Sequence, residues 1–313
     1  MDVMLIKNKH LTYTLEHAKL YLDDNEEIPM ELLLNLIGEL RVSNLLIPAV
    51  EKEDELVFEN VVFEDDDSTY LPLFTNVEEF EKHQGDDSEF EPLDNNFELY
   101  LEIVKESGVD GIIIDLEGMC IPFDKDFLAE IPTGSPVSFS DDDEDACSKE
   151  ELKEIFENPG NEEFVSFLKN DADHDNLEPL MVELSNSHLL NAVISDEPLD
   201  EFAQDGIIES SDVDGFSLFV IDDDPIHMAM IFTSKEEMAE TLKDSEANFY
   251  GQITVLTDLF EFVLRNDMDG IVINPNSLEY YILREEILSQ ARGIELIAED
   301  GRFRDSLDYA FLI

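Results

Sequence analysis

The stretch "VDGIIID" at residues 109–115 returns later in the chain as "MDGIVIN" at residues 268–274. In both, an aspartate and a glycine lead into a run of branched apolar residues. Asp and Gly tolerate turn conformations, and so short a β-branched run is typical of a buried strand rather than a helix. Each stretch therefore predicts a turn that enters a core strand. The structural motif consists of Asp110, Gly111, Asp269 and Gly270.

A second pair of stretches repeats at nearly the same separation: "LPLFTNVEEF" at 71–80 and "AMIFTSKEEM" at 229–238. Each is an apolar run followed by capping-box spacing. In the first copy this is Thr75 with Glu78 or, one residue later, Asn76 with Glu79. A strand that passes directly into a capped helix is predicted in both places. Because two separate stretches agree, we expect two tandem copies of one domain.

Each predicted copy also contains an amphipathic helix with an apolar stripe facing the core. The stripe residues are Phe97, Tyr100, Leu101 and Val104 in the first copy, and Ile253, Leu256, Phe260 and Val263 in the second. Hairpin connections interleaved with such helices favour a mixed or mainly antiparallel sheet flanked by helices. The predicted fold class is therefore α+β, in two tandem copies.

Composition and pattern set the predicted boundaries. The segment 133–148 combines Pro, Gly, Ser and an acidic run, which is typical of a linker. The predicted parts are a first domain at 10–132, an acidic flexible linker at 133–148, a second domain at 149–291 and a C-terminal extension at 292–313.

The second copy is longer than the first. Helices are expected near 149–157 and 162–169, and we interpret "LEPLMVEL" at 177–184 as the strand equivalent to "NLLIPAV" at 44–50. This alignment leaves an insertion near 185–213 in the second copy, with an apolar stretch "LLNAVI". That stretch is a candidate interaction segment, represented by Leu189, Leu190, Val193 and Ile194.

The charge of the chain restricts its partners. It has 78 acidic and 18 basic residues, a formal net charge of −60, with 43% hydrophobic residues. This apolar content argues against disorder. Too few cations are present to neutralise phosphates, so we expect neither nucleic acid nor an anionic membrane as a partner. A basic protein partner fits the charge, and so does a purely solubilising surface. Since the carboxylates repel one another, added salt is expected to raise the melting temperature.

The sequence predicts a cytoplasmic protein. The apolar stretch near the N-terminus is short and broken by Lys7 and Lys9, and no segment approaches the length of a membrane-spanning helix. Cys120 is expected to be an inert core thiol in an apolar strand, and Cys147 to be exposed. The two cysteines form no disulfide framework or zinc spacing. The oligomeric state is left open.

We predict no catalytic, cofactor-binding or metal-binding residue. The run Asp171, Asp173 and Asp175 resembles the start of a calcium loop, but Asn176 and Val182 stand where Gly and Glu are required, so a helix-to-strand loop is expected. Other acidic features are the aspartate triplets at 65–67, 141–143 and 222–224, interpreted as solvated turns. The histidines at 10, 17, 83, 174, 188 and 227 have no ligand spacing. Asp115 ends a strand, but the second copy has Asn274 there.

The order "LLIPAV", "LPLFTNVEEFEKH", "VDGIIID", repeated as "LEPLMVEL", "AMIFTSKEEMAETL", "MDGIVINPNSLEYYIL", resembles the SseB N-terminal domain family in two tandem copies. The first copy departs from this pattern by having "DLEG" where the second has "NPNS". The resemblance implies a fold and a cytoplasmic setting, and it implies no catalytic residue or cofactor.

The absence of a catalytic motif, together with the duplication and the charge, favours a non-enzymatic protein-interaction or regulatory module with a strongly acidic surface. The alternative is an enzyme or small-ligand binder that uses a cleft between the two domains, with carboxylates such as Asp115 as polar anchors.

Overall fold

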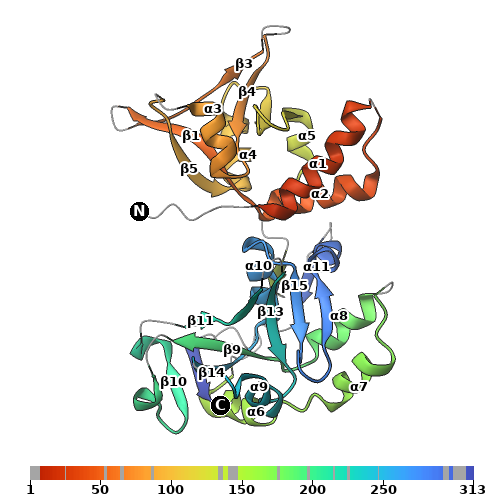
Figure 1. The fold of residues 1–313 in the computed structure, drawn as a ribbon, viewed down its shortest axis with the longest axis vertical. Helices are drawn as coiled ribbons and strands as arrows, with labels where there is room; N and C mark the ends of the chain where they lie inside the picture. Colours follow the sequence, from red (N-terminus) through yellow and green to blue (C-terminus); the bar gives the residue numbers. More distant parts are fainter. Residues whose placement is uncertain are drawn as a thin grey trace. The chain divides into compact units, whose positions relative to one another are not determined.

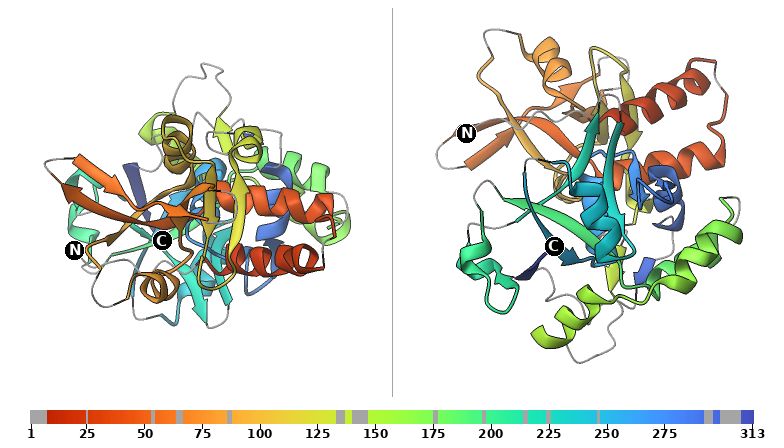
Figure 2. Two further views of the ribbon diagram at one scale, coloured as in Figure 1. Left: turned by 90° about the horizontal axis from the view of Figure 1, so that it is seen from above. Right: turned by 60° about the horizontal axis from the view of Figure 1, so that its bottom comes forward.

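A computed structural model of the chain divides it into two compact units, each an α+β assembly with mixed or antiparallel sheets (Figure 1; Figure 2). Unit 1 is Met1–Pro136 with Ala291–Ile294, and unit 2 is Val137–Gln290 with Glu295–Ile313. The residues that the structure describes are 8–24, 26–52, 55–63, 67–85, 88–132, 137–139, 147–174, 177–195, 198–213, 216–223, 226–245, 247–291, 296–298 and 308–313.

Unit 1 begins with a helical hairpin and continues with strands and helices in alternation. Its elements are α1 (Lys9–Asp23), α2 (Met30–Val42), β1 (Asn44–Lys52), β2 (Glu55–Phe58), β3 (Val61–Val62), β4 (Thr69–Leu73), α3 (Val77–Gln84), β5 (Glu91–Asn96), α4 (Phe97–Glu106), β6 (Gly111–Ile114), β7 (Ile121–Asp124) and α5 (Lys125–Glu130).

The strands of unit 1 form two short sheets, ordered β2-β1-β5 and β3-β4-β6-β7. All neighbours are antiparallel except β4 and β6, which are parallel. One bridge joins the sheets, in which the backbones of Leu46 and Phe74 exchange hydrogen bonds of 2.9 and 2.8 Å. The strand β7 contains Pro122, which cannot donate to a ladder, and it lies at the edge of its sheet.

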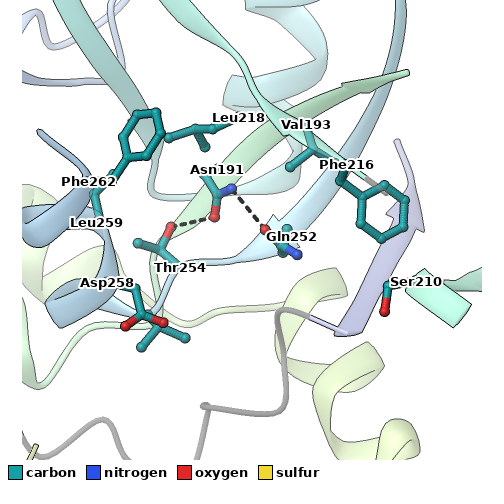
Figure 3. Close-up of a pocket in the computed structure, with 11 residues that line it drawn as sticks. Asn191, Val193, Ser210, Phe216, Leu218, Gln252, Thr254, Asp258, Leu259 and Phe262 are labelled. Atoms are coloured by element: carbon teal, nitrogen blue, oxygen red, sulfur yellow. Dashed lines mark hydrogen bonds between the residues drawn. The ribbon is translucent and has the colours of Figure 1, made fainter. Parts of the chain in front are cut away.

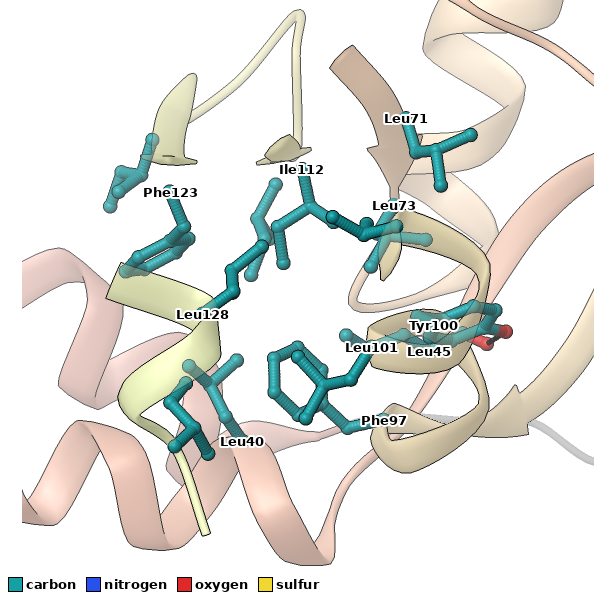
Figure 4. Close-up of a cluster of buried hydrophobic side chains, with 14 of the residues drawn as sticks. Leu40, Leu45, Leu71, Leu73, Phe97, Tyr100, Leu101, Ile112, Phe123 and Leu128 are labelled. Carbon is teal, nitrogen blue, oxygen red and sulfur yellow. Dashed lines mark hydrogen bonds between the residues drawn. The ribbon is translucent and has the colours of Figure 1, made fainter. Parts of the chain in front are cut away.

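The main core of unit 1 fills the space between β1, β4 and β6 and the helices α1, α2, α4 and α5 (Figure 4). The predicted stripe of α4 is buried there in full: Phe97, Tyr100, Leu101 and Val104. The Tyr100 hydroxyl donates to the carbonyl of Leu45 at 2.6 Å, so this large aromatic side chain is buried with its polar end satisfied. A smaller cluster of Leu46, Phe74 and Phe80 lies under α3.

Unit 2 contains the remaining elements. They are β8 (Val137–Phe139), α6 (Lys149–Glu157), α7 (Glu162–Asn170), α8 (Leu177–Ser185), β9 (Leu190–Ser195), η1 (Asp200–Phe202), β10 (Ile207–Glu209), η2 (Ser210–Asp212), β11 (Ser217–Leu218), β12 (Val220–Asp223), β13 (Ile226–Phe232), α9 (Lys235–Leu242), β14 (Asn248–Ile253), α10 (Leu256–Arg265), β15 (Gly270–Ile273), β16 (Tyr280–Leu283), α11 (Arg284–Ala291), β17 (Leu296–Ala298) and β18 (Tyr309–Leu312).

The main sheet of unit 2 has the order β10-β18-β14-β9-β13-β15-β16, with β13 and β15 parallel. On one of its faces α6 and α9 cover a second core that contains Phe156 and Phe311, whose rings stack at 4.8 Å. A Cβ built on Gly251 of β14 would lie 2.1 Å from the Phe156 ring, so glycine is what allows α6 to approach this strand.

The predicted passage from strand to capped helix is confirmed in both units. Asn76 caps α3 by accepting a hydrogen bond from the Glu79 amide at 3.0 Å, and Ser234 caps α9 through the Glu237 amide at 3.2 Å. The later of the two predicted registers is therefore the one used. A capping box of Ser148 and Glu151 opens α6.

The interpretation of 177–184 as a strand is wrong, because these residues form α8. The run of Leu, Met and Val was too short for its period to separate strand from helix. The strand that follows is β9, and its bridge to Phe232 is the counterpart of the bridge between Leu46 and Phe74. In this register β9 corresponds to β1, so the segment 185–213 is not wholly an insertion; the additional elements η1, β10 and η2 begin after β9.

The predicted linker and extension contain regular structure where they are described. Val137–Phe139 of the linker form β8, which pairs in parallel with β17, and Tyr309–Leu312 of the extension form β18 inside the main sheet of unit 2. The rest of the linker up to residue 146, including the triplet 141–143, lies outside the described residues.

Candidate functional site

The aspartate of each repeated "DG" pair fastens three segments of backbone. In unit 1 the Asp110 carboxylate accepts from the Thr69 amide at 2.8 Å, and in unit 2 Asp269 accepts from the His227 amide at 2.8 Å. The backbone carbonyls of Asp110 and Asp269 accept from Lys125 and Arg284, at 2.7 and 2.8 Å. Each aspartate thus ties the start of one strand to the end of another, which is a structural role.

The glycine that follows lies against a backbone carbonyl. A Cβ built on Gly111 would be 2.1 Å from the Phe123 carbonyl oxygen, and one on Gly270 would be 2.2 Å from that of Ile282. Gly270 also has a φ of 149°, which L side chains rarely adopt. Any side chain at either position would displace the neighbouring edge strand, so glycine is required in both units for the same steric reason.

The residue at the end of each repeated strand, Asp115 or Asn274, holds the strand before the capped helix. Asp115 accepts from the Thr75 amide at 2.9 Å and from its hydroxyl at 2.8 Å. Asn274 accepts from the Thr233 amide at 2.9 Å and donates to its hydroxyl at 2.7 Å. Both residues have left-handed φ angles, 49° and 46°, which Asp and Asn tolerate better than other side chains.

The enclosure of Asp115 argues against a role as a polar anchor for a ligand. Its side chain has 0% exposure, and both carboxylate oxygens accept from Thr75. Burial raises the pKa of Asp115 to about 6, against the opposing effect of these hydrogen bonds. The corresponding amide in unit 2 makes the same connections without a charge, so the acid is one of two solutions to a structural requirement.

Sequence reasoning missed a matching pair of asparagines. The Asn8 side-chain amide donates to the carbonyls of Asn44 and Thr75, at 2.6 and 2.8 Å. Asn161 donates in the same way to His188 and Thr233, at 2.7 and 3.0 Å. Each asparagine precedes the first helix of a hairpin, α1 or α7. The sequence does contain an asparagine just before each of these two helices. Aligning the two asparagines makes α7 the equivalent of α1 and α8 the equivalent of α2.

The helical hairpin of unit 1 presents apolar side chains to solvent among carboxylates. Here the acidic hairpin surface means the exposed apolar residues Tyr13, Leu20, Leu22, Met30 and Leu34 of α1 and α2, with the exposed carboxylates Asp23, Asp24, Glu26, Glu27 and Glu31. In the hairpin of α7 and α8, Val182 is the exposed large apolar residue among those described. Apolar surface rimmed by charge marks interaction sites in many proteins.

Unit 2 contains a pocket of about 360 Å³ between the sheet and α10 (Figure 3). The side chains of Asn191, Gln252 and Thr254 form a polar floor on β9 and around the end of β14, and Leu259 and Phe262 of α10 line one side. This volume lies within the range of small-molecule sites. The pocket was not expected from the sequence, because it depends on strand register.

The residues predicted as an interaction segment lie in the core instead. Leu189 precedes β9 and is buried, and Leu190 and Val193 of β9 are buried while Ile194 is half-buried. In the main sheet of unit 2, β9 lies between β14 and β13. Apolar side chains in such a position pack against other parts of the unit, and they are not available to a partner of the folded protein.

The cysteines also differ from expectation. Cys120 is exposed, because it lies in a turn with a φ of 54° just before β7 rather than inside an apolar strand. Glu279 has the same left-handed conformation before β16, so the turn recurs in unit 2. Cys147 is half-buried and packs against the second core of unit 2 rather than being exposed.

The acidic runs and histidines do not gather into a metal site in the described part of the chain. No three side chains of His, Cys, Asp or Glu there form a group that could hold a metal ion. Asp171 and Asp173 lie between α7 and α8, so the loop joins two helices rather than a helix and a strand. Residues 65, 66, 175 and 224 lie outside the described residues.

Within the described ranges, no helix combines the length and the hydropathy required to cross a bilayer. The described geometry therefore defines an α+β module whose repeated polar residues support the backbone, with a pocket in unit 2 and an acidic hairpin surface in unit 1.

Residues 31–130 match the family model of the SseB protein N-terminal domain. The match covers about a third of the chain and spans α2 to α5 of unit 1. No curated protein and no solved structure matches the chain significantly.

Proposed function

We propose that the chain is a non-enzymatic, cytoplasmic protein-interaction module made of two SseB-type domains, the second at 149–291. The proposal of a second domain is supported by the hydrogen bonds that recur in unit 2. Asp269, Asn274 and Asn161 bind the backbone at the places that Asp110, Asp115 and Asn8 occupy in unit 1. Because these polar residues hydrogen-bond to the backbone, they support a shared fold and give no support to a catalytic site.

The observation that carries the interaction role is the acidic hairpin surface of unit 1. Met30 is 69% and Leu20 is 63% exposed, and exposed carboxylates surround the turn between α1 and α2. The surface fits a basic amphipathic segment of another protein, in which an apolar stripe meets the exposed leucines and lysines or arginines meet the carboxylates. The formal net charge of −60 would accelerate the encounter with such a partner.

A defined peptide tests this surface directly. The probe is a helical peptide with a leucine stripe and a lysine-rich opposite face, and binding to the full chain is measured by calorimetry at low and high salt. Wild type is expected to bind, with affinity falling as salt rises. The double variant L20E/M30E is expected to bind less well, because two carboxylates replace the apolar contacts.

The matched control is V182E, which places a carboxylate at a 53% exposed apolar position on α8 of unit 2. This variant is expected to bind like wild type. Equal losses in L20E/M30E and V182E, or no loss in either, would contradict the assignment. Affinity purification from cytoplasm at low and high salt, together with cell fractionation, then tests whether a basic protein partner and the proposed location exist.

A further inference from the structure

The pocket of unit 2 lies where unit 1 is filled by side chains. In unit 1, Leu46 of β1 forms a β-bridge with Phe74, which follows β4. In unit 2, Leu190 of β9 pairs in the same way with Phe232 of β13. The next residue in each first strand is therefore equivalent: Ile47 in unit 1 and Asn191 in unit 2. Ile47 pairs with Leu93 of β5, whereas Asn191 pairs with Gln252 of β14. Two apolar positions in one unit are thus amides in the other.

Two large side chains that fill this region in unit 1 are smaller in unit 2. Tyr100 is the fourth residue of α4, and the fourth residue of α10 is Leu259. Phe58 pairs with Ala49 of β1, and at the equivalent place Leu218 pairs with Val193 of β9. The Tyr100 ring is fully buried in unit 1, whereas Leu259 and Leu218 both line the pocket. The smaller side chains at these two equivalent positions leave space in unit 2, although Phe262 of α10 is larger than its counterpart Ile103 of α4.

The floor of the pocket is a connected set of buried polar groups. The Thr254 hydroxyl donates to the Asn191 carbonyl oxygen at 3.0 Å, and the Asn191 amide nitrogen donates to Gln252 at 3.3 Å. Asn191, Gln252 and Thr254 are all less than 10% exposed. The Asn191 amide uses one N–H and one lone pair in these bonds, so one of each remains on a residue that lines the pocket. Burying amides in place of Ile and Leu costs free energy unless they are hydrogen-bonded, and the bonds described here use only part of the capacity of Asn191.

We propose that this pocket binds a small uncharged aromatic molecule that carries an amide or hydroxyl group. Its ring would occupy the space beside Leu259 that the Tyr100 ring fills in unit 1, and its polar group would meet Asn191. Among the lining residues the charged one is Asp258, which opposes an anion. This site lies in unit 2 and does not depend on the acidic hairpin surface.

The test compares benzamide with benzoate, which have the same shape and differ in charge. Binding to the full chain is followed by NMR, through the side-chain amide signals of Asn191 and Gln252. Benzamide is expected to shift these signals with a dissociation constant on the order of 1 mM or tighter, as its size permits. Benzoate is expected to bind at least roughly tenfold more weakly, a difference of about 1.4 kcal/mol. Equal binding of the two compounds, or no shift with benzamide, would overturn the proposal.

Variants that copy unit 1 locate the binding. L259Y restores the tyrosine of unit 1 and is expected to abolish benzamide binding by filling the pocket. The matched control L283Y makes the same change at an exposed position of β16 and is expected to leave binding unchanged. If L259Y fails to fold, N191I serves in its place and is expected to weaken binding by roughly tenfold through loss of the amide. Undiminished binding to a folded L259Y or N191I protein would refute the site.

Discussion

The two units share the same side-chain hydrogen bonds to the backbone, but their cores contain different side chains. In unit 1 the strand-end position is an acid, Asp115, and the core contains the fully buried Tyr100. In unit 2 the strand-end position is a neutral amide, Asn274, and the core is hollow beside Leu259. The "DG" turn is common to both units, so the fold requires it. The core side chains at the positions of Tyr100 and Leu259 differ between the units, so these positions are free to take on a function.

The largest effect is expected at the shared glycines. G111A and G270A would each place a methyl group about 2 Å from a carbonyl oxygen of the adjacent edge strand, so the free energy of unfolding of the affected unit should fall by roughly 3 kcal/mol or more. Hydrogen-exchange mass spectrometry on peptides from each unit would measure the loss. G108A is the matched control, since a Cβ there meets nothing within 4 Å. A loss in G108A as large as in G111A would refute the steric explanation.

Exchanging the core residues of the two units should change their stabilities in opposite directions. Y100L removes a fully buried ring from unit 1 and is expected to lower its free energy of unfolding by about 3 kcal/mol. L259Y fills an existing pocket in unit 2 and is expected to leave stability unchanged or higher. Denaturation with urea, followed by exchange within each unit, measures both. A similar loss in the two variants would show that the hollow is not the equivalent of the tyrosine site.

Exchanging the strand-end residues should alter the pH dependence. The folded-state pKa of Asp115 is about 6, above its ordinary value of 3.8, so ionised Asp115 opposes folding above about pH 6, and the penalty is relieved as pH falls towards 4. D115N, which copies unit 2, is expected to stabilise unit 1 by about 1–3 kcal/mol at pH 7.5 and by almost nothing at pH 4. The control N274D should lose stability at pH 7.5. A stabilisation by D115N that is independent of pH would rule out the buried charge as its cause.

The smallest effect concerns both units together. The chain has 78 acidic and only 18 basic side chains, so repulsion among the carboxylates outweighs attraction between opposite charges. Added sodium chloride screens this repulsion and is expected to raise the melting temperature by a few degrees. Differential scanning calorimetry between low and moderate salt measures this shift. A melting temperature that is constant or falls with salt would contradict net repulsion in the folded state.

Local signals in the sequence were sufficient for much of the frame. Helix caps such as Asn76 with Glu79, and the branched strand after Gly111, depend on neighbours within a few residues and can therefore be predicted without a structure. The strand β14 was missed, and α8 was predicted as a strand, because their apolar runs are short and their final state is decided by tertiary packing.

The candidate sites depended on long-range register and could not be read in advance. The equivalence of Asn191 with Ile47 appears only once β9 is paired with β13 and β14. The alignment made from the sequence placed Asn191 inside the predicted insertion near 185–213, where it has no counterpart in the first copy. The exposure of Leu20 and Met30 was also hidden, since an apolar residue near a helix end in the sequence gives no sign of what covers it.

The pairing of strand β18 predicts that the two units fold at different rates. Its residues Tyr309–Phe311 pair with Ile207–Glu209 of β10, about 100 residues earlier, whereas the most widely separated pair between β1 and β5 in unit 1 is Asn44 with Asn96. Contacts between distant parts of the chain slow the search for the native state, because a longer loop must close before they are made. Unit 1 is therefore expected to reach its native state first, so that unit 2, with its pocket, is completed on a chain that is already half folded.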